Sequence, residues 1–238
     1  MPTLESVPRH LDLPAVSFFG RTLDEYCRFF ALDPGKWQRR AVLDVGGGPA
    51  SFTAEASRRG IDAVAVDPCY DRPVAALEHQ VRQDYGKMFA QIRARPHLFR
   101  LKAFPTLADA ESDRRLAARG FLADYDGNAR HGRYVRGALP LLPFLDGAFD
   151  LVLCAHLLFI HSAQFDFSWH LSACVELTRV SGGEVRIHPV CGADGRPYAE
   201  LDRLLQELQA RGVRGSVRPV DYEFFTGSAS MLVLSRHA

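Results

Sequence analysis

The chain has 238 residues, of which 47% are hydrophobic, and its 29 basic side chains nearly balance its 28 acidic ones. A chain of this length and composition can bury one sizeable core, so we expect a single domain over residues 1–238. The formal net charge of +1 gives no overall field that would attract nucleic acid or a membrane surface. No apolar run approaches the roughly 18 residues of a membrane-spanning helix, which argues against a membrane protein.

The cysteines and the N-terminus bear on the cellular compartment. The five cysteines are odd in number and include no Cys-x-x-Cys pair. They are therefore typical of reduced thiols in a cytoplasmic protein, and they predict neither a disulfide framework nor a metal site. The first residues contain prolines and acids without an apolar stretch, so no signal peptide is expected.

The first expected helix begins at residues 22–25, whose sequence Thr-Leu-Asp-Glu is typical of a capping box. This helix precedes the first strand of the expected sheet. We interpret residues 1–40 as an N-terminal helical cap on the domain.

A strand and a glycine-rich turn follow, and they are the most informative part of the sequence. Residues 41–45 are apolar except for one acid, Asp44. The chain then passes through three glycines and a proline: Gly46, Gly47, Gly48 and Pro49. Such a run predicts a buried parallel strand that ends at the carboxyl edge of a sheet, where open α/β folds bind their ligands. Glycines there let the backbone approach a cofactor, and a helix over residues 51–59 would point its N-terminal amides at the same place.

The second expected strand, residues 62–66, ends in Asp67, which lies 23 residues after Asp44. An acid at this distance suits hydrogen bonds to the two hydroxyls of a ribose. Asp67 and the adjoining Pro68 are therefore predicted to contact a nucleoside-containing cofactor. The alternative role of Asp67 is that of a helix N-cap.

The charge of the site indicates which nucleoside is bound. The dinucleotide fingerprint requires a glycine at its sixth place, where this chain has Ser51. The carboxylate of Asp44 would repel a pyrophosphate, whereas it suits the sulfonium and the α-amino group of S-adenosyl-L-methionine. S-adenosyl-L-methionine is therefore the favoured cofactor.

An unusually long interval separates Asp67 from the next expected strand, near residues 133–136. Residues 74–92 keep a helical period of apolar side chains until Pro96 breaks it. A plain crossover needs about a dozen residues or two. We therefore interpret residues 71–131 as a helical insertion between strands 2 and 3.

This insertion and the N-terminal helix are predicted to form a lid that selects the second ligand, because the sheet itself carries the cofactor. Six aromatic residues in these parts of the chain are candidates for an apolar pocket: Phe18, Phe19, Tyr26, Tyr70, Tyr85 and Phe89. Packing of the helices on the sheet is the alternative role, and it is favoured for most of the six.

The remaining chain continues to alternate between strands and helices. Residues 151–154 form an apolar run fit for a central fourth strand, and Gly182–Gly183 are expected to end the helix that follows it. Three polar side chains alternate along the expected fifth strand: Glu184, Arg186 and His188. Either they pair with one another, or the last of them, His188, reaches the substrate cleft. The alternation predicts an α/β fold with three layers and a mainly parallel sheet.

Two motifs resemble those of the class I S-adenosylmethionine-dependent methyltransferases. In the first, Asp44, Gly46 and Gly48 match an apolar-Asp-apolar-Gly-x-Gly-x-Gly motif whose last glycine is replaced by Ala50. In the second, residues 142–154 resemble the Leu-Pro-Phe…Phe-Asp segment that leads into the family's fourth strand. The resemblance spans about half of the chain. It implies a seven-stranded, Rossmann-like methyltransferase sheet with S-adenosyl-L-methionine as the cofactor.

The resemblance also implies how the cofactor is held. The turn from Gly46 to Pro49 would wrap the methionine part, Asp67 would bind the ribose, and Asp44 would bond the amino group directly or indirectly. The family often has an acid that bonds the adenine, but the matching position here is Ala138. The backbone of Ala138 and Leu139 would hold the adenine edge instead.

Four further residues are candidates for the site. Arg21 and Tyr26 of the cap are candidate partners of the cofactor carboxylate. Cys154, which ends the fourth strand, is a candidate cofactor contact that acts as a small apolar residue and not as a nucleophile. His156 follows this strand, close to where the methyl group is presented, and is the candidate catalytic residue; a packed or solvated histidine is the alternative.

The predicted reaction is transfer of the sulfonium methyl to an oxygen, nitrogen or carbon of a small-molecule acceptor. Such a displacement needs mainly an aligned, dehydrated approach of the nucleophile, with at most one base. Two alternatives remain: a non-catalytic S-adenosylmethionine-binding or regulatory protein, and an RNA methyltransferase.

Two segments bear on nucleic acid as a partner. Residues 154–157 replace the Asn/Asp-Pro-Pro-aromatic segment with which base-methylating members of the family grip an sp² nitrogen, which counts against base methylation. Residues 82–102 hold six basic side chains against a single acid, but a solvated helix face is favoured over a nucleic-acid surface. No histidine pair has metal-ligand spacing, so no metal is predicted. The sequence specifies neither the acceptor nor the oligomeric state.

Overall fold

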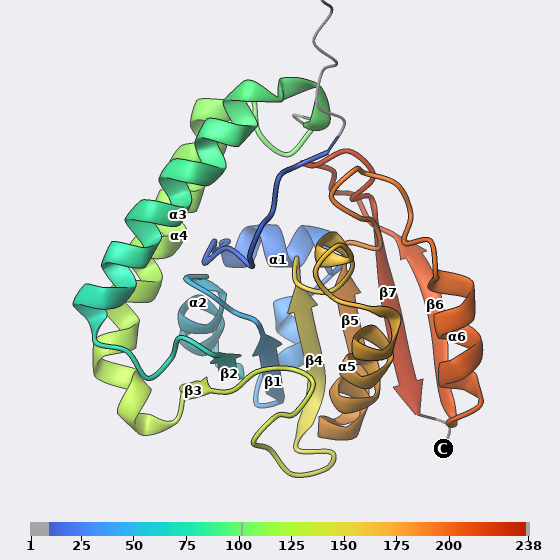
Figure 1. Ribbon diagram of the computed structural model, residues 1–238. Coiled ribbons are helices and arrows are strands. Elements are labelled where there is room, and N and C mark those ends of the chain that lie inside the picture. Colours follow the sequence, from blue (N-terminus) through green and yellow to red (C-terminus); the bar gives the residue numbers. More distant parts are fainter. Residues whose placement is uncertain (1–9, 101, 237–238) are drawn as a thin grey trace, which may run out of the picture.

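The computed structural model describes residues 10–100 and 102–236, so the first nine residues of the predicted cap lie outside the described part. Its centre is a seven-stranded sheet with the order β3-β2-β1-β4-β5-β7-β6 (Figure 1). The strands are β1 (Ala41–Val45), β2 (Asp62–Asp67), β3 (Tyr134–Arg136), β4 (Phe149–Ala155), β5 (Ser181–His188), β6 (Val213–Pro219) and β7 (Ser230–Arg236).

The sheet is mainly parallel. Strands β3, β2, β1, β4 and β5 pair with one another in parallel. Strand β7 is antiparallel to both of its neighbours, β5 and β6. The connection between β6 and β7 holds only ten residues, 220–229, which is too few for the crossover that a parallel pair requires. The predicted seven-stranded, Rossmann-like sheet is confirmed, with one antiparallel hairpin at its end.

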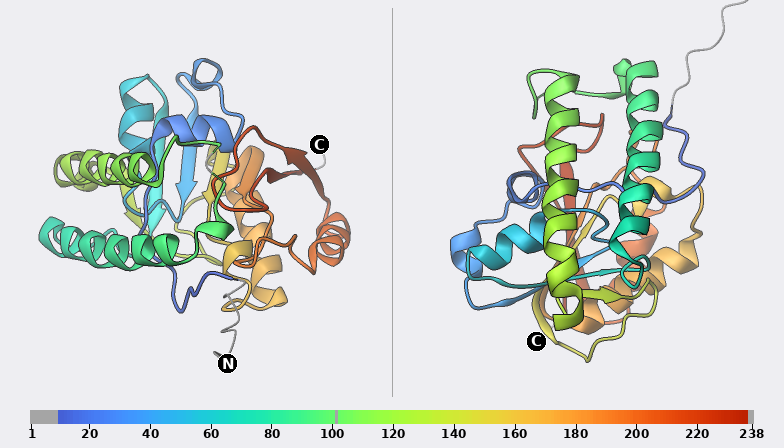
Figure 2. Two further views of the ribbon diagram at one scale, coloured as in Figure 1. Left: turned by 90° about the horizontal axis from the view of Figure 1, so that it is seen from above. Right: turned by 90° about the vertical axis from the view of Figure 1, so that its left-hand side faces the viewer.

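Helices cover both faces of the sheet, which gives the predicted three layers (Figure 2). The α-helices are α1 (Leu23–Phe29), α2 (Phe52–Arg58), α3 (Val74–Ala94), α4 (Leu107–Asn128), α5 (Phe167–Val180) and α6 (Leu201–Gln209). Short 3-10 helices are η1 (Pro34–Trp37), η2 (Pro96–Leu98), η3 (Ala129–His131) and η4 (Phe159–His161). On β1, Val42 packs in the core with α1 and α2, while its neighbour Leu43 packs in the core with α5 and α6. Both faces of the sheet are therefore apolar, as a parallel sheet requires.

Between β2 and β3 the chain forms the two long helices α3 and α4, which lie side by side and extend beyond the carboxyl edge of the sheet (Figures 1 and 2). The apolar period seen in the sequence is the buried face of α3: Leu77, Val81, Tyr85, Phe89 and Ile92. Pro96 opens η2 and so ends the period at the predicted place. The predicted helical insertion is therefore present.

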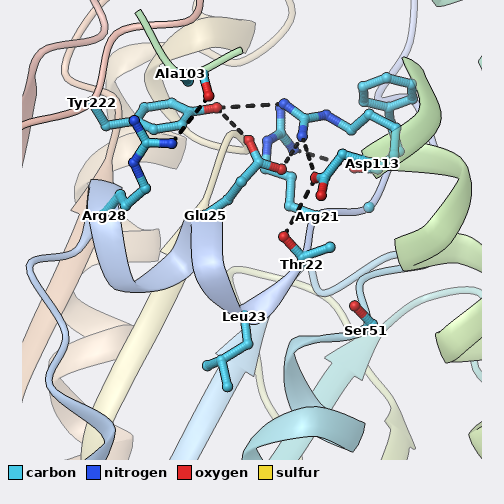
Figure 3. Close-up of polar contacts among 12 residues, drawn as sticks. Arg21, Thr22, Leu23, Glu25, Arg28, Ser51, Ala103, Asp113 and Tyr222 are labelled. Atoms are coloured by element: carbon cyan, nitrogen blue, oxygen red, sulfur yellow. Dashed lines mark hydrogen bonds and ion pairs between the residues drawn. The ribbon is translucent and has the colours of Figure 1, made fainter. Parts of the chain in front are cut away.

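A buried ion pair fastens this insertion to the rest of the molecule. The guanidinium of Arg114 on α4 donates to the carboxylate of Glu25 on α1, and the hydroxyl of Tyr222, from the β6–β7 connection, donates to the same carboxylate (Figure 3). The side chains of Arg114 and Glu25 are only 1% and 2% exposed. We call Glu25, Arg114 and Tyr222 the clasp.

The clasp explains why the predicted capping box does not form. Helix α1 begins after Thr22 as expected, but the side chain of Thr22 does not cap it. The hydroxyl of Thr22 donates instead to Asp113 of α4 at 3.4 Å (Figure 3), and the carboxylate of Glu25 is taken by Arg114. Both side chains that local sequence would assign to the cap have found partners on another element.

The glycines predicted to end the helix after β4 have a different role. Helix α5 ends at Val180, and Gly182 and Gly183 lie inside β5. A Cβ on Gly183 would lie 2.2 Å from the carbonyl oxygen of Asp150. The register between β4 and β5 shifts at this point, so the two glycines form a bulge in which the two backbones approach closely.

Candidate functional site

A cavity of about 490 Å³ lies at the carboxyl edge of the sheet. Part of its wall consists of residues at or just after the carboxyl ends of β1, β2, β3 and β4. Examples, in the same order, are Gly46, Asp67, Ala138 and His156. The opposite part comes from the N-terminal segment and α3. The predicted cofactor segments and the predicted lid thus share one cavity.

The turn after β1 requires glycine for steric reasons. Gly46 and Gly48 have φ angles of +68° and +52°, which residues with a Cβ rarely adopt. A Cβ on Gly47 would lie 2.9 Å from Asp44 Oδ2 and equally close to the Tyr70 hydroxyl. The turn therefore presents bare backbone at the cavity, as a cofactor-binding loop does.

Asp67, at the end of β2, lines the cavity and is tied to this turn. Its Oδ2 accepts a hydrogen bond from the Gly48 amide at 3.1 Å, and its Oδ1 accepts one from the Cys69 amide at 2.9 Å. Burial raises the pKa of Asp67, while these hydrogen bonds oppose that shift. Each carboxylate oxygen keeps a lone pair for a further donor.

Asp44 lies beneath the turn and does not line the cavity. Its carboxylate accepts hydrogen bonds from the Tyr26 hydroxyl at 3.0 and 3.1 Å. Both side chains are buried, and burial raises the pKa of Asp44 to about 7. Tyr26 therefore links α1 to Asp44, the acid of the first motif.

The structure brings eight of the thirteen predicted site residues into the cavity wall. These are Arg21, Gly46, Gly48, Asp67, Pro68, Ala138, Leu139 and His156. The remaining five are outside it: Tyr26, Asp44, Gly47, Pro49 and Cys154. Cys154 is fully buried in the sheet, where it packs with the core under α5 and α6.

Arg21 places a cation beside the glycine turn. Its carbonyl accepts a hydrogen bond from the Ser51 amide at 3.1 Å, which holds the start of α1 against the turn. Its guanidinium donates to the Phe19 carbonyl at 3.3 Å, and no carboxylate of the described residues lies within 4.0 Å of it. Burial lowers the pKa of this side chain, yet an arginine stays charged.

His156 follows β4 with a left-handed backbone, at a φ of +54°. Its amide donates to the carbonyl of His188 at 2.6 Å, which fixes the residue at the cavity wall. Its Nδ1 has no hydrogen-bond partner among the described residues. Burial, together with Arg21 and other nearby bases, holds the pKa of His156 well below its ordinary value, so the imidazole is neutral at physiological pH.

The polar residues of β5 pair locally. Arg186 donates to Glu184 and to the Phe30 carbonyl, and His188 Nε2 donates to the Ser228 carbonyl at 2.6 Å. None of the three lines the cavity. Of the two roles left open by the sequence, pairing within the structure is the one observed.

Part of the predicted N-terminal helical cap is not helical and runs along the cavity wall. We call residues 11–20 the strap. The Phe18 amide donates to Asp84 at 2.8 Å, the Gly20 amide donates to the Tyr85 hydroxyl at 3.2 Å, and the Asp12 amide donates to Gln91 at 3.0 Å. The strap is therefore bonded along α3. Asp84 is the single acid between Arg82 and Lys102, but no pattern in the sequence marks it as the anchor of the strap.

The aromatic wall also differs from the predicted one. Of the six candidates, Phe18 and Phe19 line the cavity, while Tyr26, Tyr70, Tyr85 and Phe89 lie in the core with 4% exposure or less. Other aromatic side chains join the wall from distant parts of the chain: Phe99, Phe165, Trp169, Phe224 and Phe225. Their convergence depends on tertiary structure, so no local pattern marks them.

Several basic residues between Arg82 and Lys102 are paired. Arg82 contacts Glu78, Arg93 contacts Glu111, and Lys102 contacts Glu223. These pairs favour the solvated helix face over a surface for nucleic acid. Within the described ranges, no group of three or more His, Cys, Asp or Glu side chains is arranged to hold a metal ion. No helix described here has both the length and the apolar character to cross a membrane.

The chain is similar to several known proteins. No family model matches the chain. An uncharacterized protein of Methanocaldococcus jannaschii is 28% identical over 229 residues, which cover 96% of this chain and all of the relative. Among solved structures, a TehB-like SAM-dependent methyltransferase from Corynebacterium glutamicum is 17% identical, with a TM-score of 0.44 over 84% of this chain and 82% of that one.

Two further solved structures are similar at comparable levels. A putative S-adenosyl-L-methionine-dependent methyltransferase from Methanococcus maripaludis is 12% identical, with a TM-score of 0.47 over 91% of this chain and 84% of that one. The magnesium protoporphyrin IX methyltransferase of Synechocystis, solved with bound SAM, is 13% identical, with a TM-score of 0.45 over 90% and 78% of the two chains. With its strand order and antiparallel β7, the chain has the Rossmann-like fold of class I methyltransferases. Its activity has to be argued from the cavity.

Proposed function

We propose that the protein is an S-adenosyl-L-methionine-dependent methyltransferase that acts on a small-molecule acceptor. The observation that carries this proposal is the joining of the glycine turn to Asp67 at one cavity, through the 3.1 Å hydrogen bond from the Gly48 amide. A bare backbone turn beside an oriented acid, at the carboxyl edge of parallel strands, suits a nucleoside cofactor. The five free cysteines favour a cytoplasmic location.

The residues of the wall fit the parts of this cofactor. Asp67 would accept hydrogen bonds from the ribose hydroxyls, and the backbone of Ala138 and Leu139 would hold the adenine edge. The glycine turn would pass along the methionine part, and Arg21, which has no acidic partner in the described structure, would pair with its carboxylate. Asp44 would act on the amino group from below the turn, through the field of its carboxylate.

The bound cofactor supplies an electrophilic methyl group on a positively charged sulfur. The chain has to hold the acceptor in line with this methyl group and to exclude water. The apolar side chains of the cavity wall perform the second task. His156, at the end of β4, is positioned to meet the acceptor, and its neutral imidazole can take a proton.

The proposal includes the lid. Gln80, Asp84, Met88 and Ile92 of α3 line the cavity together with residues of the strap. The insertion therefore faces the carboxyl edge of the sheet, where an acceptor would bind. Acceptor selection by these segments follows from that position.

Two experiments test the proposed function. Calorimetry with S-adenosylhomocysteine should show binding at a single site, since the product retains the ribose, adenine and amino-acid parts. Incubation with S-adenosylmethionine labelled in its methyl group should label a fraction of a cellular metabolite extract and not stripped RNA. Labelled RNA would favour an RNA methyltransferase, and tight binding without transfer to any fraction would favour a non-catalytic binding protein.

A further inference from the structure

Much of the cavity wall is aromatic. Side chains from four separate segments line it. They are Phe19 of the strap; Phe99 after η2; Phe165 and Trp169 around the start of α5; and Phe224 and Phe225 of the β6–β7 connection. Phe165 and Trp169 are stacked, with ring centroids 3.8 Å apart. Flat aromatic walls of this kind bind planar, apolar molecules through large contact areas.

The charges of the described wall are already engaged. They belong to Arg21, Asp67 and Asp84. In the proposed function, Arg21 pairs with the carboxylate of the cofactor and Asp67 binds its ribose. The Oδ2 of Asp84 accepts hydrogen bonds from the Phe18 amide at 2.8 Å and from the Gln80 side chain at 3.0 Å, so this acid anchors the strap. An anionic acceptor would lose its hydration without gaining a free cation in this wall, and a cationic acceptor would compete with the strap for the carboxylate of Asp84.

Two imidazoles are among the uncharged polar groups of this wall. His156 and His161 both line the cavity, and the Nδ1 of each has no hydrogen-bond partner among the described residues. The side chain of His161 is 4% exposed, and burial lowers its pKa to about 4. Both rings are therefore neutral near pH 7. Because these Nδ1 atoms are buried, a ligand in the cavity would meet the other ring nitrogen, Nε2, which suits a ligand with a hydroxyl group.

We propose that the acceptor is an uncharged aromatic molecule with a phenolic hydroxyl, bound with its ring in the aromatic wall and its hydroxyl against His156. This proposal rests on the proposed function, because it names the acceptor of the same site.

The chemistry balances with the groups present. The phenolic oxygen forms a bond to the methyl carbon, the carbon–sulfur bond breaks with its electron pair moving to sulfur, and the hydroxyl proton passes to the imidazole of His156. The positive charge of the sulfonium is lost as an imidazolium forms, so the cavity keeps its net charge. A phenol, with a pKa of about 10, can give its proton to a weakly basic imidazole, whereas an alkanol is a much weaker acid. Besides burial, the groups that oppose a positive charge on His156 and so lower its pKa are Arg21, His188, Arg114 and His161.

The choice of acceptor is tested with three naphthalene probes of nearly the same size. With S-adenosylhomocysteine bound, 2-naphthol should bind at least about tenfold more tightly than 2-naphthoic acid or 2-naphthylmethylamine, and with S-adenosylmethionine it should be methylated on oxygen. If the protein binds S-adenosylhomocysteine but prefers a charged probe, or binds 2-naphthol without methylating it, the proposal is overturned. If the protein does not bind S-adenosylhomocysteine, the proposed function fails instead.

The role of His156 is tested with His156→Asn, because asparagine tolerates the left-handed backbone at this position. Methylation of 2-naphthol should slow about 100-fold or more, the usual contribution of a general base, while the affinities for S-adenosylhomocysteine and 2-naphthol stay within a few-fold. In the wild type the rate should fall only at acidic pH, where the imidazole becomes protonated, and the variant should lose this dependence. The matched control is His79→Asn, on the exposed face of α3, which should keep the wild-type rate. An unchanged rate in His156→Asn would overturn the proton-acceptor role.

Discussion

Two backbone amides orient the carboxylate of Asp67. The amides belong to Gly48 in the glycine turn and Cys69 in the next loop, so the position of the acid is fixed by the two segments that flank the cavity. A side chain held in this way loses little conformational freedom when a ligand binds.

The first prediction concerns this acid. Asp67→Ala should weaken the binding of S-adenosylhomocysteine by about 1–3 kcal/mol, the usual range for lost hydrogen bonds to a charged group. Titration calorimetry measures the change. The control is Asp71→Ala, which removes an exposed acid paired with Arg136 and should leave the affinity unchanged. Equal affinities for wild type and Asp67→Ala would refute the ribose contact.

Asp44 provides the second prediction, on the pH dependence of stability. Its pKa is about 7 in the folded protein against about 3.9 in an unfolded chain, so the folded state binds a proton more tightly. The tighter binding of this proton stabilises the folded state. The stabilisation is complete below pH 4 and is lost as the pH rises through 7. It amounts to about 4 kcal/mol at most, since one pKa unit corresponds to 1.36 kcal/mol.

The variant Asp44→Asn should abolish this loss, because an amide oxygen still accepts the hydrogen bond from Tyr26 but does not ionise. Urea denaturation measures the free energy of unfolding of both proteins. The value for the variant minus the value for the wild type should increase between pH 4 and pH 8. The control is Asp62→Asn, at the exposed start of β2, which should follow the wild type at every pH. If the difference in free energy of unfolding between Asp44→Asn and the wild type is the same at every pH, folding does not raise the pKa of Asp44.

At the scale of elements, the insertion depends on the clasp. Arg114 lies against the rings of Phe104 and Phe224, with its guanidinium carbon 5.3 Å from each ring centroid. Burial lowers the pKa of Arg114 to about 10, so it remains charged at physiological pH. A buried charge of this kind is costly once its partner is removed.

The third prediction tests the clasp. Glu25→Leu should lower the free energy of unfolding by up to about 3–5 kcal/mol, because it removes the closer of the two carboxylates that pair with the buried guanidinium of Arg114 and leaves only Asp113, at 3.4 Å. The double variant Glu25→Leu with Arg114→Met should recover most of that loss. Arg115→Met is the control: this neighbour forms an exposed pair with Glu111, and its loss should cost less than about 1 kcal/mol. Urea denaturation measures all three, and a double variant no more stable than Glu25→Leu would contradict this account.

The elements themselves could be predicted from the sequence because each depends on local pattern. The apolar run before Gly46 predicted β1, and the helical period of apolar side chains from Val74 to Ile92 predicted α3. The seven-stranded, mainly parallel sheet followed from the resemblance to a known fold. The antiparallel hairpin at the end of the sheet follows from a connection too short for a crossover.

The contacts between elements could not be predicted in the same way. Thr22 and Glu25 match a capping box, but partners on α4, some 90 residues away, take both side chains. The strap shows the same limit, since the acid that anchors it, Asp84, lies 66 residues from Phe18. Tertiary partners of this kind leave no local trace in a single sequence, so the acceptor side of the site becomes visible only in the structure.

At the scale of the whole molecule, the strap connects the parts that surround the cavity. Its first residues bond to the segment after β5, where the Leu11 amide donates to the Ala193 carbonyl at 2.9 Å, and its later residues bond to α3. At Gly20 it presses on the glycine turn so closely that a Cβ there would lie 2.1 Å from the carbonyl oxygen of Pro49. A ligand that orders the glycine turn therefore acts on the strap directly and on the insertion through the strap.

The last prediction follows from this continuity. Binding of S-adenosylhomocysteine should slow amide hydrogen exchange in the glycine turn, and equally in residues 11–20 and in α3. At 100 times the dissociation constant the ligand adds about 2.7 kcal/mol, so exchange that requires release of the ligand should slow up to about 100-fold. In Asp84→Asn, which weakens the anchor at the Phe18 amide, the effect should persist in the glycine turn and diminish in the strap. Slowing confined to residues 46–48 in the wild type would show that the strap and α3 do not close over the cofactor, and the lid would then be wrong.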